Sequence, residues 1–263
     1  MTRIITTGCS FTHESDSWAN YLGGGVEPYP EGQYDLINVA EGGAGNEMNI
    51  QNAILDIHKN NYTHCIVQIS GICRFELVVD ERIESANDWF IPKENCTWIK
   101  STGDQEWWLR EKYQTETQAK LVNNALTNYT KHCYSEYQQI IRTLRAIVNC
   151  QTLCKHKQIK QLYFCWKDEF SQYFNTIKKS EELTAWWDQI DWSLFWFHNN
   201  QGGLSEWGID HNFTGKLDED HTNNPPKGWL MIDNKKTMIG HPSAECHIAF
   251  AEQVIKPWVN NTN

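Results

Sequence analysis

The sequence is short of positive charge. Its 263 residues include 23 lysines and arginines against 33 aspartates and glutamates, which gives a net charge of −10 with histidine neutral. No block of Lys or Arg offsets this acidic balance, so the composition excludes a protein that binds the phosphate backbone of nucleic acid.

Long hydrophobic runs are also missing. No apolar stretch is long enough to cross a bilayer, and no basic leader precedes an apolar segment at the amino terminus. We therefore expect no signal peptide, no membrane partner and synthesis in the cytoplasm.

Cysteine is present, but without the spacing of a metal site or a disulfide framework. The nine cysteines are scattered and include no CxxC pair. Cys150, Cys154 and His156 lie on one predicted helix and lack a second pair of ligands. We predict buried free thiols, no bound metal and no cofactor.

Short apolar runs alternate with helical patterns along the chain. The runs predict strands at 3–7, 35–40, 64–70 and 159–165, and spacings of three and four predict helices at 16–22, 46–60, 117–157 and 243–258. The pattern at 117–157 is long enough to contain a break into two helices. Strands that are apolar on successive residues are typical of a parallel sheet covered by helices, so we predict one α/β domain over residues 1–263.

Two ranges fit this scheme poorly, and we interpret them as insertions on the sheet. Residues 75–112 and 169–236 are rich in Trp, Asn, Asp and Gly, and eleven of the 13 tryptophans lie between Trp89 and Trp229. Such aromatic side chains either stack on sugar rings or fill a small core beneath long loops, and we favour the second interpretation.

Three segments carry the candidate chemistry. Ser10, in "GCSFTH", follows the first strand, and the loop "NVAEGGAGNEMNI" follows the second and opens a helix. His241, in "GHPSAECH", precedes the last helix. Ligands of open α/β sheets bind beyond the carboxyl ends of the strands, and "EGGAGN" lacks the Lys and Ser/Thr of a phosphate loop, which disfavours a flavodoxin-like nucleotide binder.

In this order the three segments resemble the SGNH (GDSL-like) hydrolase superfamily, and most closely the SGNH-like proteins of bacteriophages. The resemblance covers about a quarter of the chain. It implies a three-layer α/β/α sandwich with a flavodoxin-like parallel sheet, to which this chain adds the Trp-rich insertions. It also implies that Ser10 is the nucleophile, that His241 is the base, and that the backbone N–H groups of Ser10 and Gly43 form the oxyanion hole.

Two family features are absent. The orienting Asp belongs three residues before His241, where this sequence has Met238, and the third block, "QISGICRFE", lacks the oxyanion Asn. Asp233 is too distant in sequence from His241 for the same geometry, whereas Asp218, Glu219 or Asp220 can replace the Asp from the insertion. A Ser-His dyad held by a backbone carbonyl is the other option. Ser70 or Arg74 can point into the site, where Arg74 either holds an anionic substrate group or pairs with Glu76. Asn46 either contacts a ligand or caps a helix.

Two functions remain open from the sequence. The first is a serine esterase or deacetylase that hydrolyses an ester, such as an O-acetyl group of a glycan, with Ser10 and His241. The second is a catalytically degenerate relative that binds glycan or protein as a structural component of a phage particle, with other phage proteins as partners and the virion as its location.

Overall fold

A five-stranded, all-parallel sheet forms the centre of the computed structural model, which describes residues 2–72, 74–80, 96–101, 124, 128, 132–213, 229–232, 235–238 and 241–261. The strand order is β2-β1-β3-β6-β7. The strands are β1 (Arg3–Thr7), β2 (Asp35–Asn38), β3 (His64–Ile69), β6 (Lys160–Cys165) and β7 (Phe195–Trp196). The first four lie within two residues of the predicted runs, and the predicted parallel α/β sheet is confirmed.

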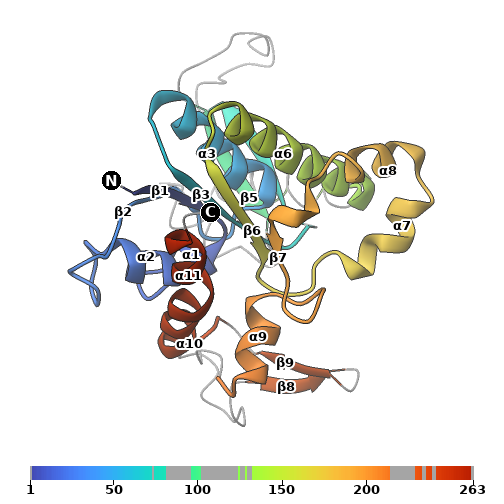
Figure 1. Cartoon of the computed structure of the whole chain (residues 1–263). Helices are drawn as coiled ribbons and strands as arrows, with labels where there is room; N and C mark the ends of the chain where they lie inside the picture. The colour runs from blue at the N-terminus through green and yellow to red at the C-terminus, as the bar shows by residue number, and fades with distance from the viewer. Residues whose placement is uncertain are drawn as a thin grey trace.

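Helices flank the sheet, as Figure 1 shows. On one side α3 (Asn46–Lys59) packs against α6 (Glu136–His156), which contacts α8 (Glu181–Trp187); α7 (Phe174–Lys178) follows a 3₁₀ turn at Ser171–Tyr173. On the other side lie α1 (Ser10–His13), α2 (Trp18–Gly23) and α10 (Ala244–Phe250), and α10 continues through a π-helical turn (Ala251–Ile255) into α11 (Lys256–Asn260). The predicted closing helix is therefore present, with a π-bulge in its middle.

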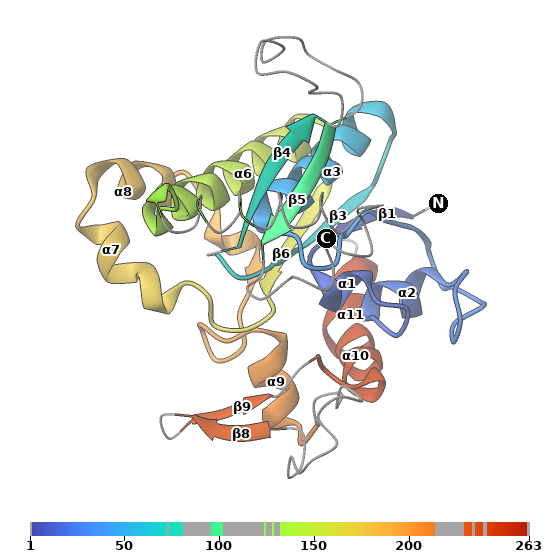
Figure 2. The same ribbon diagram turned by 180° about the vertical axis from the view of Figure 1, so that it is seen from behind.

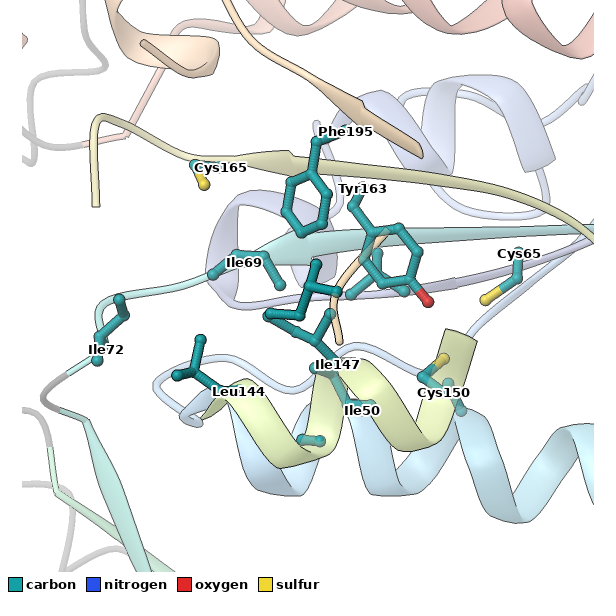
Figure 3. Packing of buried hydrophobic residues seen from close by; sticks show 14 of the residues in the cluster. Ile50, Cys65, Ile69, Ile72, Leu144, Ile147, Cys150, Tyr163, Cys165 and Phe195 are labelled. Carbon is teal, nitrogen blue, oxygen red and sulfur yellow. The ribbon is translucent and has the colours of Figure 1, made fainter. Parts of the chain in front are cut away.

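Each central strand buries side chains on both faces of the sheet, which explains the unbroken apolar runs in the sequence. Ile4, Ile66 and Phe164 belong to the hydrophobic cluster that includes Trp18 and Phe250. Ile5, Val67 and Tyr163, which alternate with them along the strands, belong to the opposite cluster, to which α3 and α6 also contribute. Figure 3 shows the side chains of Ile69 and Tyr163 directed toward Leu144 and Ile147 of α6. The two clusters hold the sheet between layers of helices.

The long helical pattern at 117–157 does contain a break. His132 is helical, Cys133 lies in a turn, and α6 begins after Ser135, whose side chain accepts a hydrogen bond from the Gln138 backbone N–H. Residues 117–123 lie outside the described part of the chain.

The two ranges interpreted as insertions differ from each other. Within 75–112, β4 (Phe75–Asp80) and β5 (Cys96–Ser101) form an antiparallel hairpin outside the central sheet. The range 169–236 is more than an insertion, because it contains β7, the edge strand of the sheet, beside a 3₁₀ turn at Trp192–Leu194. It also contains α9 (Leu204–Asp210), which contacts the antiparallel hairpin of β8 (Trp229–Ile232) and β9 (Lys235–Met238), as Figure 2 shows.

Most tryptophans whose side chains are described pack against the core, as we favoured from the sequence. Trp18 and Trp207 are buried, and the others are partly buried against one of the two hydrophobic clusters: Trp166, Trp186, Trp187, Trp192, Trp196 and Trp258. Aromatic packing therefore fixes the segment between β6 and α9 to the rest of the domain.

Candidate active site

Ser10 lies at the turn between β1 and α1. A methyl group added at Gly8 would come within 2.5 Å of Thr12 Oγ1 and 2.8 Å of Gln68 Cβ, so this turn accepts only glycine there. Ser10 is the first residue of α1, and its side chain is half-buried. The preceding Cys9 is buried, and burial raises the pKa of its thiol although the Arg74 charge opposes the shift. Cys9 therefore stays protonated, and Ser10 presents the reactive side chain.

His241 completes a hydrogen-bonded chain with Ser10. The Ser10 hydroxyl lies 2.8 Å from His241 Nε2, and His241 Nδ1 lies 2.7 Å from Glu14 Oε1. With the carboxylate as acceptor, Nδ1 carries the proton, and Nε2 accepts the hydrogen bond from the serine hydroxyl. This is the arrangement of nucleophile, base and orienting carboxylate in a Ser-His-acid triad.

Glu14 is the residue that sequence reasoning missed. It follows α1 directly, and its backbone N–H donates to the Ser10 carbonyl at 2.9 Å, which closes one helical turn. Residues four apart on a helix share a face, so the two side chains meet the same imidazole from one short segment. The usable signal was a Glu four residues after the nucleophile in "SFTHE". The sequence instead predicted a replacement carboxylate from the insertion, and those candidates, Asp218, Glu219 and Asp220, lie outside the described residues, as does Asp233.

Aromatic packing holds the His241 ring. The ring meets Phe11 edge-on, with centroids 4.7 Å apart, and Phe11 meets Trp166 edge-on at 5.1 Å. After His241 comes buried Pro242, and Ser243 caps α10 by accepting a hydrogen bond from the Cys246 backbone N–H. The His241 imidazole is therefore positioned by the start of α10 and by Phe11, the residue next to Ser10.

The glycine loop after β2 lies against Ser10. A methyl group added at Gly42 would lie 4.0 Å from Ser10 Cβ, and the next residue, Gly43, has a φ of 72°. His13 Nδ1 donates to the Ala40 carbonyl at 2.9 Å and joins α1 to this loop. Gly43, the predicted oxyanion residue, therefore follows Gly42, the glycine that approaches Ser10. Its positive φ lies in the left-handed region, which favours glycine.

Asn46 and Ser70 serve the fold. The side-chain oxygen of Asn46, Oδ1, accepts hydrogen bonds from the Ser70 backbone N–H at 2.7 Å and from the Ser70 hydroxyl at 3.1 Å. Its amide group donates to the Ser70 carbonyl at 3.1 Å and to Thr143 Oγ1 at 3.3 Å. Both residues are buried, and Asn46 is not the cap of α3, since Gly45 occupies that position. These bonds tie the start of α3 to the end of β3 and use the polar groups that we had considered for substrate.

Arg74 lies within electrostatic range of the nucleophile segment and of a buried acid. Its Nη1 is buried and has no hydrogen-bond partner among the described residues. Its charge lowers the pKa of Cys9 and of Glu169 against the stronger effect of burial, which raises both. Glu169 Oε2 accepts a hydrogen bond from the Ile72 backbone N–H at 3.3 Å. The side chain of Glu76, the alternative partner from the sequence, lies outside the described atoms.

Within the described residues, three buried thiols form the group with ligand atoms close enough for a metal ion. The sulfur atoms of Cys65, Cys150 and Cys154 lie within 4.8 Å of one another. The sequence had grouped Cys150 and Cys154 with His156, but His156 is exposed. In the structure the third thiol is Cys65, which β3 brings to α6. Figure 3 shows Cys65 and Cys150 near the hydroxyl of Tyr163. The three thiols lie within the hydrophobic core between β3, β6 and α6.

Comparison with known proteins returned no relative: neither a protein-family model nor a curated protein matches this sequence. Within the described ranges, no helix has both the length and the hydrophobicity to cross a membrane.

Proposed function

We propose that the chain is an SGNH-type serine hydrolase that cleaves an ester bond. The observation that carries the proposal is the pair of hydrogen-bond distances from His241, 2.8 Å to Ser10 Oγ and 2.7 Å to Glu14 Oε1. A serine, a histidine and a carboxylate in this order form the constellation that activates a hydroxyl for attack on an acyl group.

The reaction follows from the roles of the three side chains. Ser10 Oγ attacks the ester carbonyl while His241 Nε2 takes the hydroxyl proton, and the Glu14 carboxylate stabilises the resulting imidazolium. Collapse of the tetrahedral intermediate breaks the ester C–O bond, and the imidazolium gives its proton to the departing alcohol. Water then attacks the acyl-enzyme with His241 as base, which releases the carboxylic acid and restores Ser10.

Backbone N–H groups supply the oxyanion hole in this proposal. The N–H of Ser10 has no carbonyl partner within α1 because it occupies the first helical position. The second donor that we propose is the N–H of Gly43, the neighbour of the glycine that approaches Ser10, and each such donor contributes roughly 3 kcal/mol to transition-state stabilisation. The buried Nη1 of Arg74, which has no hydrogen-bond partner among the described residues, supports a role for this side chain in holding an anionic group of the substrate.

The fold supports the family assignment. The strand order β2-β1-β3-β6-β7 and the helices on both sides of the sheet agree with the flavodoxin-like, three-layer α/β/α sandwich that the resemblance implies. Ser10 and the glycine loop follow adjacent parallel strands, at the edge where such sheets bind ligands. An O-acetylated glycan remains the substrate that we propose from the resemblance.

One observation favours the alternative, a catalytically degenerate component of a phage particle. The polar groups of Asn46 and Ser70 are used within the fold, so neither replaces the side-chain oxyanion donor of the family. The presence of Glu14, which restores the missing carboxylate, weighs more strongly for the enzyme, because a binding protein has no need of an oriented imidazole.

The test is reaction of the purified protein with a fluorophosphonate probe and with p-nitrophenyl acetate. We expect labelling and turnover in the native protein and in Ser15→Ala, whose exposed serine lies five residues from the nucleophile, and neither in Ser10→Ala nor in His241→Ala. Circular dichroism establishes that all variants are folded. A native protein that neither labels nor turns over would refute the esterase function and favour the binding protein.

A further inference from the structure

A cavity lies in the segment between β6 and α9, outside the candidate active site. It has a volume of about 440 Å³, within the range of small-molecule sites. Five aromatic side chains line it: Phe170, Phe174, Trp187, Trp192 and Phe197. Four polar residues complete the lining: Asp168, Ser171, Asn200 and Gln201.

We propose that this cavity binds one pyranose ring of a glycan. The apolar face of a sugar packs on aromatic rings, while its hydroxyl groups require hydrogen-bond partners around the edge. A fatty acyl chain fits the lining less well, since it would cover the four polar residues without giving them a partner. The acidic net charge of the chain and the Asp168 carboxylate favour a neutral sugar over an anionic one.

The aromatic walls are held before any ligand arrives. The rings of Trp187 and Trp192 lie with centroids 4.2 Å apart, and the Trp192 indole N–H donates to the Trp187 carbonyl at 3.2 Å. Phe170 meets both indoles edge-on, at 5.7 and 5.3 Å. Rigid side chains lose little conformational entropy on binding, so this wall is suited to a weakly binding ligand such as a sugar.

The polar edge is fixed as well. His198 and Gly202 exchange two backbone hydrogen bonds, of 2.9 and 2.7 Å, and close the tight loop that carries Asn200 and Gln201. On the opposite segment, Asp168 Oδ1 accepts a hydrogen bond from the Ser171 backbone N–H at 3.1 Å. Donors and acceptors thus occupy set positions around an aromatic surface.

The cavity lies on the same edge of the sheet as the nucleophile. Its residues Asp168 and Phe170 follow the carboxyl end of β6, directly after Trp166, whose ring contacts Phe11. Phe11 in turn contacts His241 and follows Ser10 in the chain. Both sites follow the carboxyl ends of strands in one sheet, so we place the bound ring elsewhere on the same glycan that carries the ester. This last step, unlike binding itself, rests on the proposed hydrolase function.

Phe174→Ala is the decisive variant, because Phe174 is 39% exposed and its truncation leaves the core intact. Val26→Ala is the matched control, since Val26 is also 39% exposed and does not line the cavity. Binding of cellotriose, maltotriose, chitotriose and octanoate is measured by titration calorimetry and by ligand-observed NMR, in the native protein and in Ser10→Ala.

We expect at least one trisaccharide to bind the native protein, Val26→Ala and Ser10→Ala equally, and to bind Phe174→Ala about three- to tenfold more weakly. Turnover of p-nitrophenyl acetate should be unchanged in the control variant Val26→Ala. Failure of every trisaccharide to bind, equal binding by Phe174→Ala, or binding of octanoate alone would overturn the proposal. If the native protein binds a trisaccharide but shows no esterase activity, the proposed hydrolase function is refuted and the glycan site stands.

Discussion

The most informative single change is Glu14→Gln. It keeps the size of the side chain but replaces the carboxylate, which accepts the proton of His241 Nδ1 at 2.7 Å, with an amide. The amide N–H donates to Nδ1 and so favours the tautomer in which Nε2 carries the proton. That tautomer cannot accept the proton of Ser10.

The expected loss follows from the exposure of the pair. Removal of the carboxylate from a buried Ser-His-Asp triad lowers the rate by about 10⁴-fold. Here the Glu14 and His241 side chains are 28% and 27% exposed, so water replaces part of the interaction. A charge-assisted hydrogen bond contributes about 1.5–3 kcal/mol, which corresponds to a factor of roughly 10 to 150. We expect kcat/KM to fall about 100-fold in Glu14→Gln and about tenfold in Glu14→Ala, where water can accept the Nδ1 proton.

The assay is hydrolysis of p-nitrophenyl acetate, with the rate of fluorophosphonate labelling as a measure of the acylation step alone. Asp16→Asn removes a carboxylate two residues away and is the matched control for the change in net charge. If both Glu14 variants stay within twofold of the native protein while His241→Ala is inactive, Glu14 does not orient the histidine and the triad is wrong.

Two further predictions concern the turn at Ser10 and the buried acid near it. Gly8→Ala forces its methyl group against Thr12 and Gln68, so the free energy of unfolding in urea should fall by about 1–3 kcal/mol. Gly42→Ala is the control, because its methyl group meets only ordinary contacts, and it should lower the free energy of unfolding by less. Equal losses in the two variants would contradict the steric argument. Burial raises the pKa of Glu169 above 4.5, because the ionised carboxylate is less favourable in the folded protein than in the unfolded chain. This lowers the free energy of unfolding. The loss is absent at low pH and grows as pH rises through 4.5. Glu169→Gln should therefore become more stable relative to the native protein between pH 4 and pH 7, measured by urea unfolding at both values, and a difference that is constant with pH would refute this.

The sheet and most of its helices were predictable because they follow from local patterns. The strands bury both faces, so their residues are apolar in sequence, and α3 and the α10–α11 segment keep helical spacing. Even the start of α6 had a signal, since Ser135 is followed by Glu136 and a regular apolar stripe. Strand β7 was not predictable in this way, because two residues, Phe195 and Trp196, are too few to form a pattern.

Two residues of the candidate site were predictable from the order of the three motifs and from the resemblance that this order carries. Ser10 at a strand end and His241 before a helix were identified in this way, and they lie in hydrogen-bond contact. Glu14 was missed because an acidic residue at the end of a one-turn helix is common, and only the fold shows that His241, 231 residues after Ser10, returns to it. The roles of Asn46 and Ser70 were equally hidden, since a polar residue has the same letter whether it bonds to substrate or to backbone.

Because Ser10 and Glu14 share one helical turn, two of the three reactive groups are fixed by the first few residues of the chain. The third reaches them only when α10 has docked against α2, a contact between helices from opposite ends of the chain. If the proposed triad holds, Ser10 is therefore synthesised long before its base and stays inert until His241 arrives. Reactivity toward a fluorophosphonate would then report the completion of folding.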